Sequence, residues 1–158
     1  MHRPFKQLTL GMLLVLATAI TSAQTTPPAL STFSFKEATA QFRKTINPDG
    51  QNAQCGYVQA DARYKAKKGA PNIAVELDDV LYVKYQGRLI ALKTVKENKQ
   101  STNYADNTSG LRINIRLIKQ FNRSEYGESE DRLGDLTVSN SANKVLQRLK
   151  VAGWSCGV

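Results

Sequence analysis

The sequence predicts a small, mainly β domain, either an antiparallel barrel or a sandwich of about seven strands, with one N-terminal helix before them. After Cys55, apolar and polar residues alternate over most of the chain, which is the period of half-buried strands. Turn residues interrupt this alternation at short intervals, as in small all-β folds. The 158 residues suit a single domain, and no internal repeat divides them.

The N-terminus has the pattern of a cleaved secretion signal. Arg3 and Lys6 supply positive charge, residues 8–20 are apolar, and a small-residue cleavage site ends at Ala23. The apolar run is too short to span a bilayer. We therefore expect residues 1–23 to be a signal peptide, and the mature chain to be periplasmic or secreted without transmembrane insertion.

The predicted mature chain begins with a short leader and a helix. Residues 24–32 contain Thr and Pro and little apolar surface, so we expect a disordered leader before a single β-rich domain at 33–158. Ser34 and Glu37 have the spacing of a capping box. Apolar residues follow at helical intervals, at Phe35, Ala38, Phe42 and Ile46. An Asn-Pro-Asp-Gly turn at 47–50 ends the helix. Its apolar stripe most simply faces the core, and a partner-binding helix is the alternative.

The segments predicted as strands after Cys55 are 58–64, 73–77, 80–85, 88–95, 111–117, a segment around Leu136 and Val138, and 145–156. In the second segment, Ile73, Val75 and Leu77 alternate with Glu76, which faces the other way. Asp78-Asp79 turns the chain after it, and a hairpin forms about Gln86-Gly87. The last segment also fits a helix, but the spacing toward its cysteine favours a strand.

Cys55 and Cys156 are the only cysteines of the chain. In an oxidising compartment we expect them to form a disulfide, with two buried thiols as the alternative. A bridge that closes a loop of about 100 residues contributes about 4 to 5 kcal/mol in the chain-entropy model. Because the two cysteines lie at the first and last predicted strands, the bridge favours a closed barrel over a sandwich.

The only histidine, His2, lies in the predicted signal peptide. The mature protein would therefore lack the side chain that most often serves as general base or zinc ligand. The acidic residues suggest no catalytic pair, because Asp78 and Asp79 fit an exposed turn. The acidic loop at 124–131 is most simply solvated, with a calcium site as the alternative. We predict a protein that is not an enzyme and holds no metal or cofactor.

The chain is basic, with a net charge of +9 at pH 7. Lys65, Lys67 and Lys68 crowd one predicted loop, while Arg112 and Arg116 project from one face of the same strand. Such surfaces attract anionic glycans, lipid headgroups, nucleic acids and acidic proteins. Aromatic side chains are not interleaved with these cations, so we do not expect a nucleic-acid partner.

The chain carries the run Val-Lys-Tyr-Gln-Gly-Arg-Leu-Ile-Ala-Leu-Lys at 83–93, the run Thr-Asn-Tyr-Ala-Asp at 102–106, and the strand 111–117. Together these stretches resemble the periplasmic and membrane-bound inhibitors of C-type lysozyme. The resemblance implies a small exported antiparallel barrel in which an early and a late cysteine form a disulfide.

In that family, a Ser-x-Ser-Gly-x-Arg/Lys-Tyr loop enters the lysozyme cleft. When the motif is aligned on Tyr104, its other defined positions hold Asn98, Gln100, Ser101 and Asn103. Only the tyrosine agrees, and the N-terminal helix is extra to the family pattern. The resemblance therefore implies a related fold with an altered target.

We predict an exported, non-enzymatic binding protein of the cell envelope or extracellular space, whose partner is a protein or an anionic glycan. The contact is expected in the polar stretch 96–110, read as a long loop, and on the basic strand after it. A long connection without function is the alternative for this stretch. The candidate binding residues are Gln100, Ser101, Asn103, Tyr104, Arg112 and Arg116.

Two other functions stay open. One is a secreted enzyme or toxin that acts on an anionic polymer, for which Arg112, Arg116 and a carboxylate such as Glu76 or Asp135 would share one cleft. The other is a basic envelope component that binds glycan through charge alone.

Overall fold

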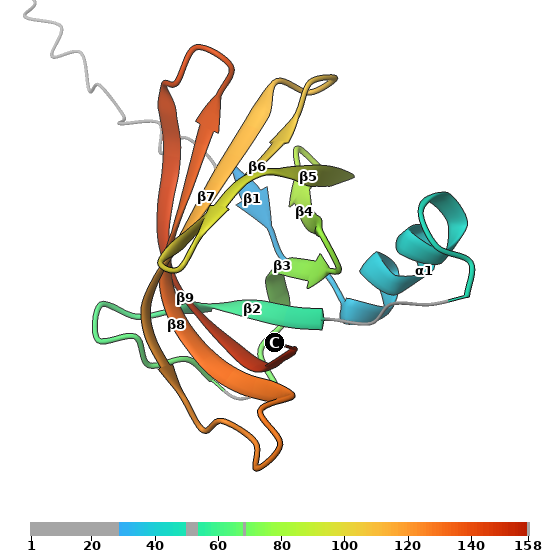
Figure 1. Ribbon diagram of the computed structural model, residues 1–158. Coiled ribbons are helices and arrows are strands. Elements are labelled where there is room, and N and C mark those ends of the chain that lie inside the picture. The colour runs from blue at the N-terminus through green and yellow to red at the C-terminus, as the bar shows by residue number, and fades with distance from the viewer. Residues whose placement is uncertain (1–28, 50–53, 68, 158) are drawn as a thin grey trace, which may run out of the picture.

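The computed structural model describes residues 29–49, 54–67 and 69–157 (Figure 1). The predicted signal peptide and residues 24–28 of the predicted leader lie outside this part of the chain. The described elements are β1 Leu30–Ser31, α1 Phe35–Thr45, β2 Gln54–Ala60, β3 Asn72–Leu77, β4 Val80–Tyr85, β5 Arg88–Asn98, β6 Ser101–Asp106, β7 Leu111–Phe121, β8 Ser129–Asn140 and β9 Val145–Gly157. Among these residues, no helix is long and apolar enough to cross a bilayer.

The strands β2 to β9 form a closed, antiparallel barrel. Their order is β4-β3-β2-β9-β8-β7-β6-β5, and β5 pairs back with β4 to complete the circle. The predicted barrel is thus confirmed, but its described part has eight strands rather than about seven. The additional strand is β6, in the stretch 96–110 that was predicted to be a long loop. The loop prediction is therefore wrong. Apolar and polar residues do not alternate in β6, because polar residues lie on both of its faces, and the sequence pattern for that reason did not predict a strand.

The first and last strands of the barrel, β2 and β9, lie side by side, as the predicted disulfide requires. Strands β2 and β9 pair from Gly56 opposite Trp154 to Ala60 opposite Lys150, and Cys55 and Cys156 form the predicted disulfide. Gly153 lies against this bridge, where a Cβ atom would approach the Cys55 sulfur to 2.8 Å. The last segment is a strand, as favoured from its spacing.

Two predicted boundaries need correction. The first barrel strand ends at Ala60, and Tyr64 instead lies in the loop after it with a left-handed φ of 57°. The leader is not disordered at its end, because Leu30 and Ser31 pair with the last residues of β4. Leu30 is buried, and its N–H donates to the Gln147 side chain at 2.9 Å. This end of the leader is ordered because Leu30 is buried and pairs with the end of β4, whatever the composition of the residues around it.

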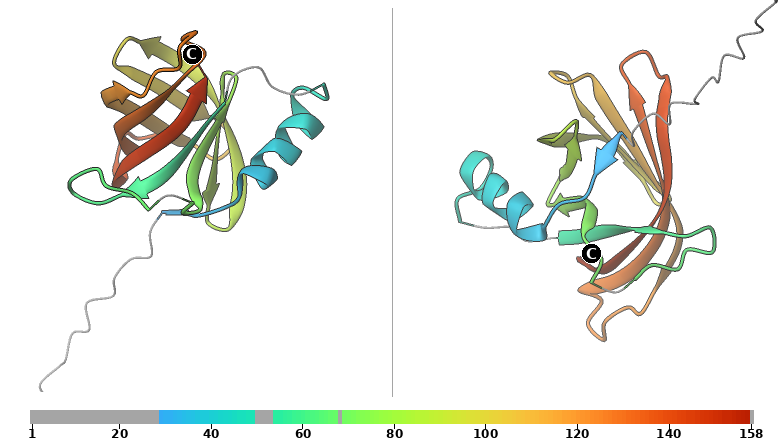
Figure 2. Two further views of the ribbon diagram at one scale, coloured as in Figure 1. Left: turned by 90° about the horizontal axis from the view of Figure 1, so that it is seen from below. Right: turned by 180° about the vertical axis from the view of Figure 1, so that it is seen from behind.

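Helix α1 lies outside the barrel wall (Figure 2). Its capping box is formed as predicted: the Glu37 N–H donates to the Ser34 hydroxyl at 3.2 Å, and the Ser34 N–H donates to the Glu37 carboxylate at 2.8 Å. The buried faces of the helix and sheet form a core separate from the barrel interior. This outer core contains Phe33, Ala38, Phe42, Val75, Leu77, Val80 and Tyr82.

Placing the helix outside the barrel determines which face of β3 is inside. Val75 and Leu77 pack against the helix. Glu76, on the opposite face, therefore points into the barrel, where it lies next to interior residues of β2 and β6. Val75, Glu76 and Leu77 alternate as predicted, but the polar side chain is the one that faces the barrel core, and Ile73 belongs to that core rather than to the face of Val75 and Leu77.

Candidate functional site

A cavity of about 550 Å³ lies at one end of the barrel. We call this end the mouth; it carries the turns at 78–79 and 99–100, the loop at 122–128 and the end of β9. The cavity is lined by Tyr57, Glu76, Glu97, Asn98, Lys99, Thr102, Tyr104, Ile115, Leu117, Gln120, Arg123 and Arg132. Its walls are mostly polar, so it suits a polar guest or a polar group of a larger partner.

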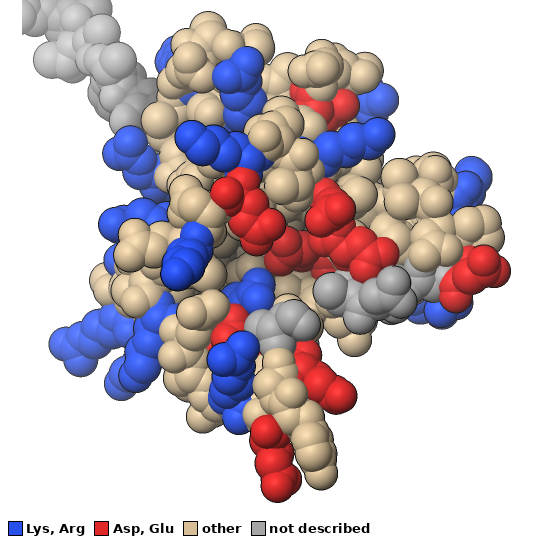
Figure 3. Space-filling view, viewed as in Figure 1, with Lys and Arg blue, Asp and Glu red and all other residues tan. Residues whose placement is uncertain are grey.

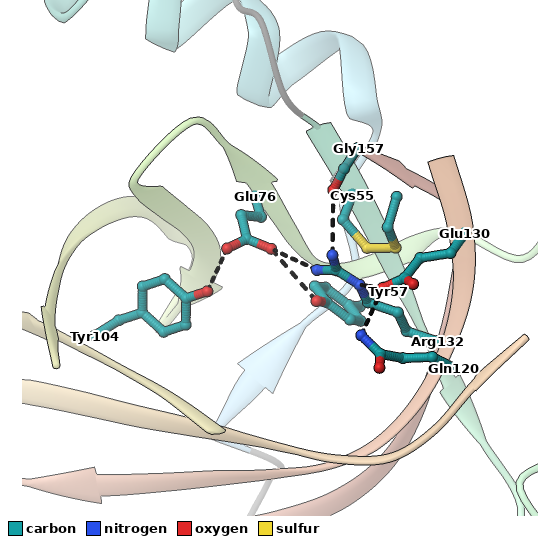
Figure 4. The surroundings of a disulfide bond; sticks show 9 residues. Cys55, Tyr57, Glu76, Tyr104, Gln120, Glu130, Arg132 and Gly157 are labelled. Atoms are coloured by element: carbon teal, nitrogen blue, oxygen red, sulfur yellow. Dashed lines mark hydrogen bonds and ion pairs between the residues drawn. A yellow bond between two sulfur atoms is a disulfide. The ribbon is translucent and has the colours of Figure 1, made fainter. Parts of the chain in front are cut away.

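Glu76 is the centre of the polar cluster in this cavity (Figure 4). The Tyr104 hydroxyl donates to one carboxylate oxygen at 2.5 Å, and the Tyr57 hydroxyl donates to the other at 3.4 Å. The Arg132 guanidinium lies 3.9 Å from the second oxygen. Three strands, β2, β6 and β8, thus converge on a carboxylate supplied by β3.

A buried carboxylate, that of Glu130, holds Arg132 in place. Glu130 is 4% exposed and accepts hydrogen bonds from the Arg132 Nε at 2.8 Å and from the Gln120 amide at 2.7 Å. Arg132 also donates to the carbonyl of Gly157 at 3.2 Å. Figure 4 shows this pair beside the disulfide, which anchors the neighbouring strand ends. A half-buried cation with this many partners is fixed in position.

Burial changes the acid–base behaviour of the cluster. Loss of solvent raises the pKa of Glu76 above its ordinary 4.5, although hydrogen bonds from Tyr104 and Tyr57 and the charge of Arg132 oppose the rise. Burial also raises the pKa of Tyr57 and Tyr104, and the negative charge of Glu76 raises both further. Both tyrosines therefore act as hydrogen-bond donors at neutral pH.

Acidic residues concentrate around the mouth of this basic protein. Of the 13 acidic residues in the chain, eight belong to the cavity, its turns or the adjoining loop and strand ends: Glu76, Asp78, Asp79, Glu97, Glu125, Glu128, Glu130 and Asp131. Figure 3 shows Asp and Glu gathered at the centre of one face and below it, with Lys and Arg along its left-hand edge, across its top and beside the lower acidic residues. The cavity is also lined by the cations Lys99, Arg123 and Arg132, and the eight acidic residues of this end outnumber these three.

The predicted binding residues divide between two surfaces. Tyr104 is 1% exposed and belongs to the mouth cavity. Gln100 lies in the tight turn between β5 and β6, where its carbonyl accepts from Leu117. The other four point outward from the barrel wall: Ser101, Asn103, Arg112 and Arg116. The sequence analysis grouped them as one long loop and the strand after it, but they lie on two paired strands along which inward and outward residues alternate.

The same division separates the residues proposed for an enzyme acting on an anionic polymer. Arg116 and Asp135 meet on the outer wall with a nitrogen-to-oxygen distance of 2.6 Å. Arg112 lies farther along β7 and donates to the Asn143 side chain at 3.3 Å. Glu76 is inside the barrel, so these four residues do not share a single cleft.

Sequence reasoning missed most of the mouth cluster. The sequence offered one sign of the cluster, because Glu76 interrupts an apolar strand. Its partners Tyr57 and Arg132 come close to it only when the barrel closes, which the sequence pattern does not show. Glu130 was predicted to lie in a solvated loop, whereas it is buried at the start of β8. Within the described residues, no group of three or more His, Cys, Asp or Glu side chains is placed to hold a metal ion.

No model of a known protein family matches the chain, and comparisons with curated proteins and with solved structures find no match either. The resemblance to lysozyme inhibitors therefore stays a prediction.

Proposed function

We propose that this chain is an exported, non-enzymatic binding protein that captures a basic partner protein at the mouth of its barrel. The observation that carries the proposal is the mouth cavity itself, where a carboxylate is held in an open, polar pocket. Its site of action would be the periplasm or the extracellular space. The proposal keeps the lysozyme-inhibitor interpretation, with contacts made by the mouth rather than by an inserted loop.

The geometry of Glu76 supports a cationic guest. The side chain is 20% exposed, so it borders the cavity, and the nearest cation, Arg132, is 3.9 Å away. The carboxylate is therefore oriented by two tyrosines but is only weakly neutralised. A lysine or arginine side chain entering the cavity would gain a charge-assisted hydrogen bond in a partly desolvated site, where such bonds are stronger than in water.

The acidic rim supports a protein partner larger than a free cation. Glu97 lines the cavity, while Glu125 and Glu128 lie exposed on the adjoining loop. A basic partner would be repelled by most of this molecule, but attracted by the face that contains the cavity. Such a charge pattern orients the encounter and increases the association rate at low salt.

The test is a calorimetric titration of the mature chain, with its disulfide intact, against a C-type lysozyme as the basic protein. We expect saturable binding that weakens as salt is added. Glu76→Gln removes the charge from the cavity floor, and Glu97→Gln with Glu125→Gln removes two charges from the rim. Each variant is expected to weaken binding by about tenfold, the effect of losing about 1.4 kcal/mol of binding free energy.

Two controls separate the mouth from net charge. Glu37→Gln with Asp49→Asn removes the same charge as the rim variant, but near α1, and should change affinity by less than about twofold. Glutamine retains the capping role at position 37. Lysozyme whose lysines have been succinylated should not bind. Equal binding of native and succinylated lysozyme, or no binding of the native protein, would contradict the proposal.

A further inference from the structure

We infer that the outer wall of β7, β8 and β9 is a second binding site, and that its ligand is an acidic polysaccharide. This site does not depend on the mouth proposal. Outward-facing cations on β7 and β9 form two columns, which we call the basic columns: Arg112 and Arg116 on one side, Arg148 and Lys150 on the other. Between them, β8 presents Asp135, Thr137 and Ser139.

The strand register places these residues in rows across the wall. Arg116 pairs with Asp135, which pairs with Lys150, and Asn114 pairs with Thr137, which pairs with Arg148. Neighbouring strands are about 4.8 Å apart, so the two basic columns lie roughly 10 Å from each other. A hollow of about 410 Å³ covers both rows. A chain lying along β8 would have cations on both sides.

Asp135 organises the hollow rather than repelling an anion. It accepts from Arg116 at 2.6 Å and from the Tyr64 hydroxyl at 2.7 Å, and Lys150 lies 3.6 Å away. Burial raises the pKa of Asp135, but the hydrogen bonds and the nearby cations lower it overall, so this carboxylate stays ionised. Because it fixes two cations at once, the hollow keeps an excess of positive charge in a defined geometry.

The loop between β2 and β3 extends this surface. Tyr64 adopts a left-handed φ of 57°, which is rare for an aromatic residue. Its hydroxyl binds Asp135, and the Lys150 ammonium lies 3.8 Å from its ring centroid. The Asp61 carboxylate accepts from the backbone N–H groups of Arg63 and Lys65 at 2.7 and 2.9 Å, which orders the loop. Tyr64 thereby ties the loop to the same wall.

The chemistry of the wall favours a polysaccharide among anionic ligands. The hydroxyl groups of Thr137 and Ser139 lie between the basic columns, and the amide of Asn114 lies between the two arginines of the β7 column; all three suit the hydroxyls of sugars. Successive nucleic-acid bases require several aromatic platforms. Among the described residues that line the hollow none is aromatic, and the nearby Tyr64 is already bound to Asp135 and Lys150.

The experiment measures binding of the mature, disulfide-bonded chain to polygalacturonate by calorimetry at two salt concentrations. Fully methyl-esterified polygalacturonate, which keeps the sugar and loses the charge, is the matched ligand. We expect binding to the acid form, and at least about tenfold weaker binding to the ester. Arg112→Gln, Arg116→Gln and Arg148→Gln, combined in one variant, should weaken binding to the acid form by about tenfold or more.

The control variant tests whether position matters beyond net charge. Lys36→Gln, Arg43→Gln and Lys44→Gln remove the same charge from exposed positions on α1 and should change affinity by less than about twofold. An equal loss in both triple variants would overturn the inference. So would equally tight binding to double-stranded DNA or to phosphatidylglycerol-containing vesicles, or shortening of the polymer during the titration.

The second site and the mouth can fail separately. Glu76→Gln should leave polygalacturonate binding unchanged, because Glu76 lies inside the barrel. The triple arginine variant should retain lysozyme binding. If Glu76→Gln abolishes both activities while the protein stays folded by circular dichroism, the two-site interpretation is wrong.

Discussion

The inner and outer faces of β6, β7 and β8 belong to the same strands but have different surroundings and different expected roles. On the inner face, Tyr104 and Arg132 belong to a buried cluster in which each polar group has a partner. On the outer face, Arg112 and Arg116 are exposed and face solvent. Buried polar groups must be paired to avoid a large desolvation cost, whereas exposed cations stay accessible to a ligand even where they have a partner in the protein. The inner face should therefore determine stability and local acidity, and the outer face affinity for anions.

The largest expected effect comes from removing the disulfide next to the inner cluster. Cys55→Ala with Cys156→Ala should lower the free energy of unfolding by about 4 to 5 kcal/mol, because the bridge closes a loop of 101 residues in the unfolded chain. Urea denaturation measures this loss, and reduction of the wild-type protein should reproduce it. A loss below about 1 kcal/mol would mean that strand pairing alone closes the barrel.

Tyr104 gives the next largest effect and distinguishes packing from hydrogen bonding. Replacement by alanine should cost about 3 to 5 kcal/mol, because the ring is almost fully buried. Replacement by phenylalanine removes only the hydroxyl that donates to Glu76 and should cost about 1.5 to 3 kcal/mol. An outward-facing residue of the same strand provides the comparison, because Ser101→Ala should stay within about 0.5 kcal/mol in the same denaturation assay.

A smaller effect should be visible in the pH dependence of stability. The pKa of Glu76 is raised in the folded state, so the folded protein binds this proton more tightly than the unfolded chain. The contribution of Glu76 to the free energy of unfolding therefore falls as pH rises from the unfolded value of 4.5 through the folded pKa. Relative to wild type, Glu76→Gln should gain stability from about pH 4 to pH 7. A constant difference across this range would contradict the assigned burial.

The smallest effect on stability is expected on the outer face. Arg116→Gln breaks an ion pair with Asp135 in which the arginine side chain is 61% exposed, so the free energy of unfolding should change by about 0.5 kcal/mol or less. The same substitution should weaken polygalacturonate binding measurably. A loss of stability comparable to that of Tyr104→Phe would show that the outer row supports the fold.

The sequence was sufficient for features that depend on local pattern. The helix with its capping box, the turn at Gln86-Gly87 and the disulfide between Cys55 and Cys156 are all as predicted. Each follows from turn chemistry, spacing or the small number of cysteines. Strand β6 was not recognisable, because polar residues occupy both of its faces and the period of two is lost.

The mouth could not be assembled from sequence for a different reason. Alternation shows that Glu76 and its neighbours Val75 and Leu77 lie on opposite faces, but it does not show which face is inside. Helix α1 decides this by covering the outer face of β3 and β4. Glu76 then meets Tyr104 and Arg132 only because the sheet closes, which brings together residues far apart in the chain.

The central claim is that the mouth binds a basic partner while the outer wall stays free. An NMR titration of isotopically labelled mature protein with C-type lysozyme tests it most directly. We predict shifts at Tyr57 and Tyr104 and in the backbone at 97–102 and 122–128, with the guanidinium signals of Arg112 and Arg116 unchanged. Shifts confined to those two arginines, or no saturable shift, would contradict the account.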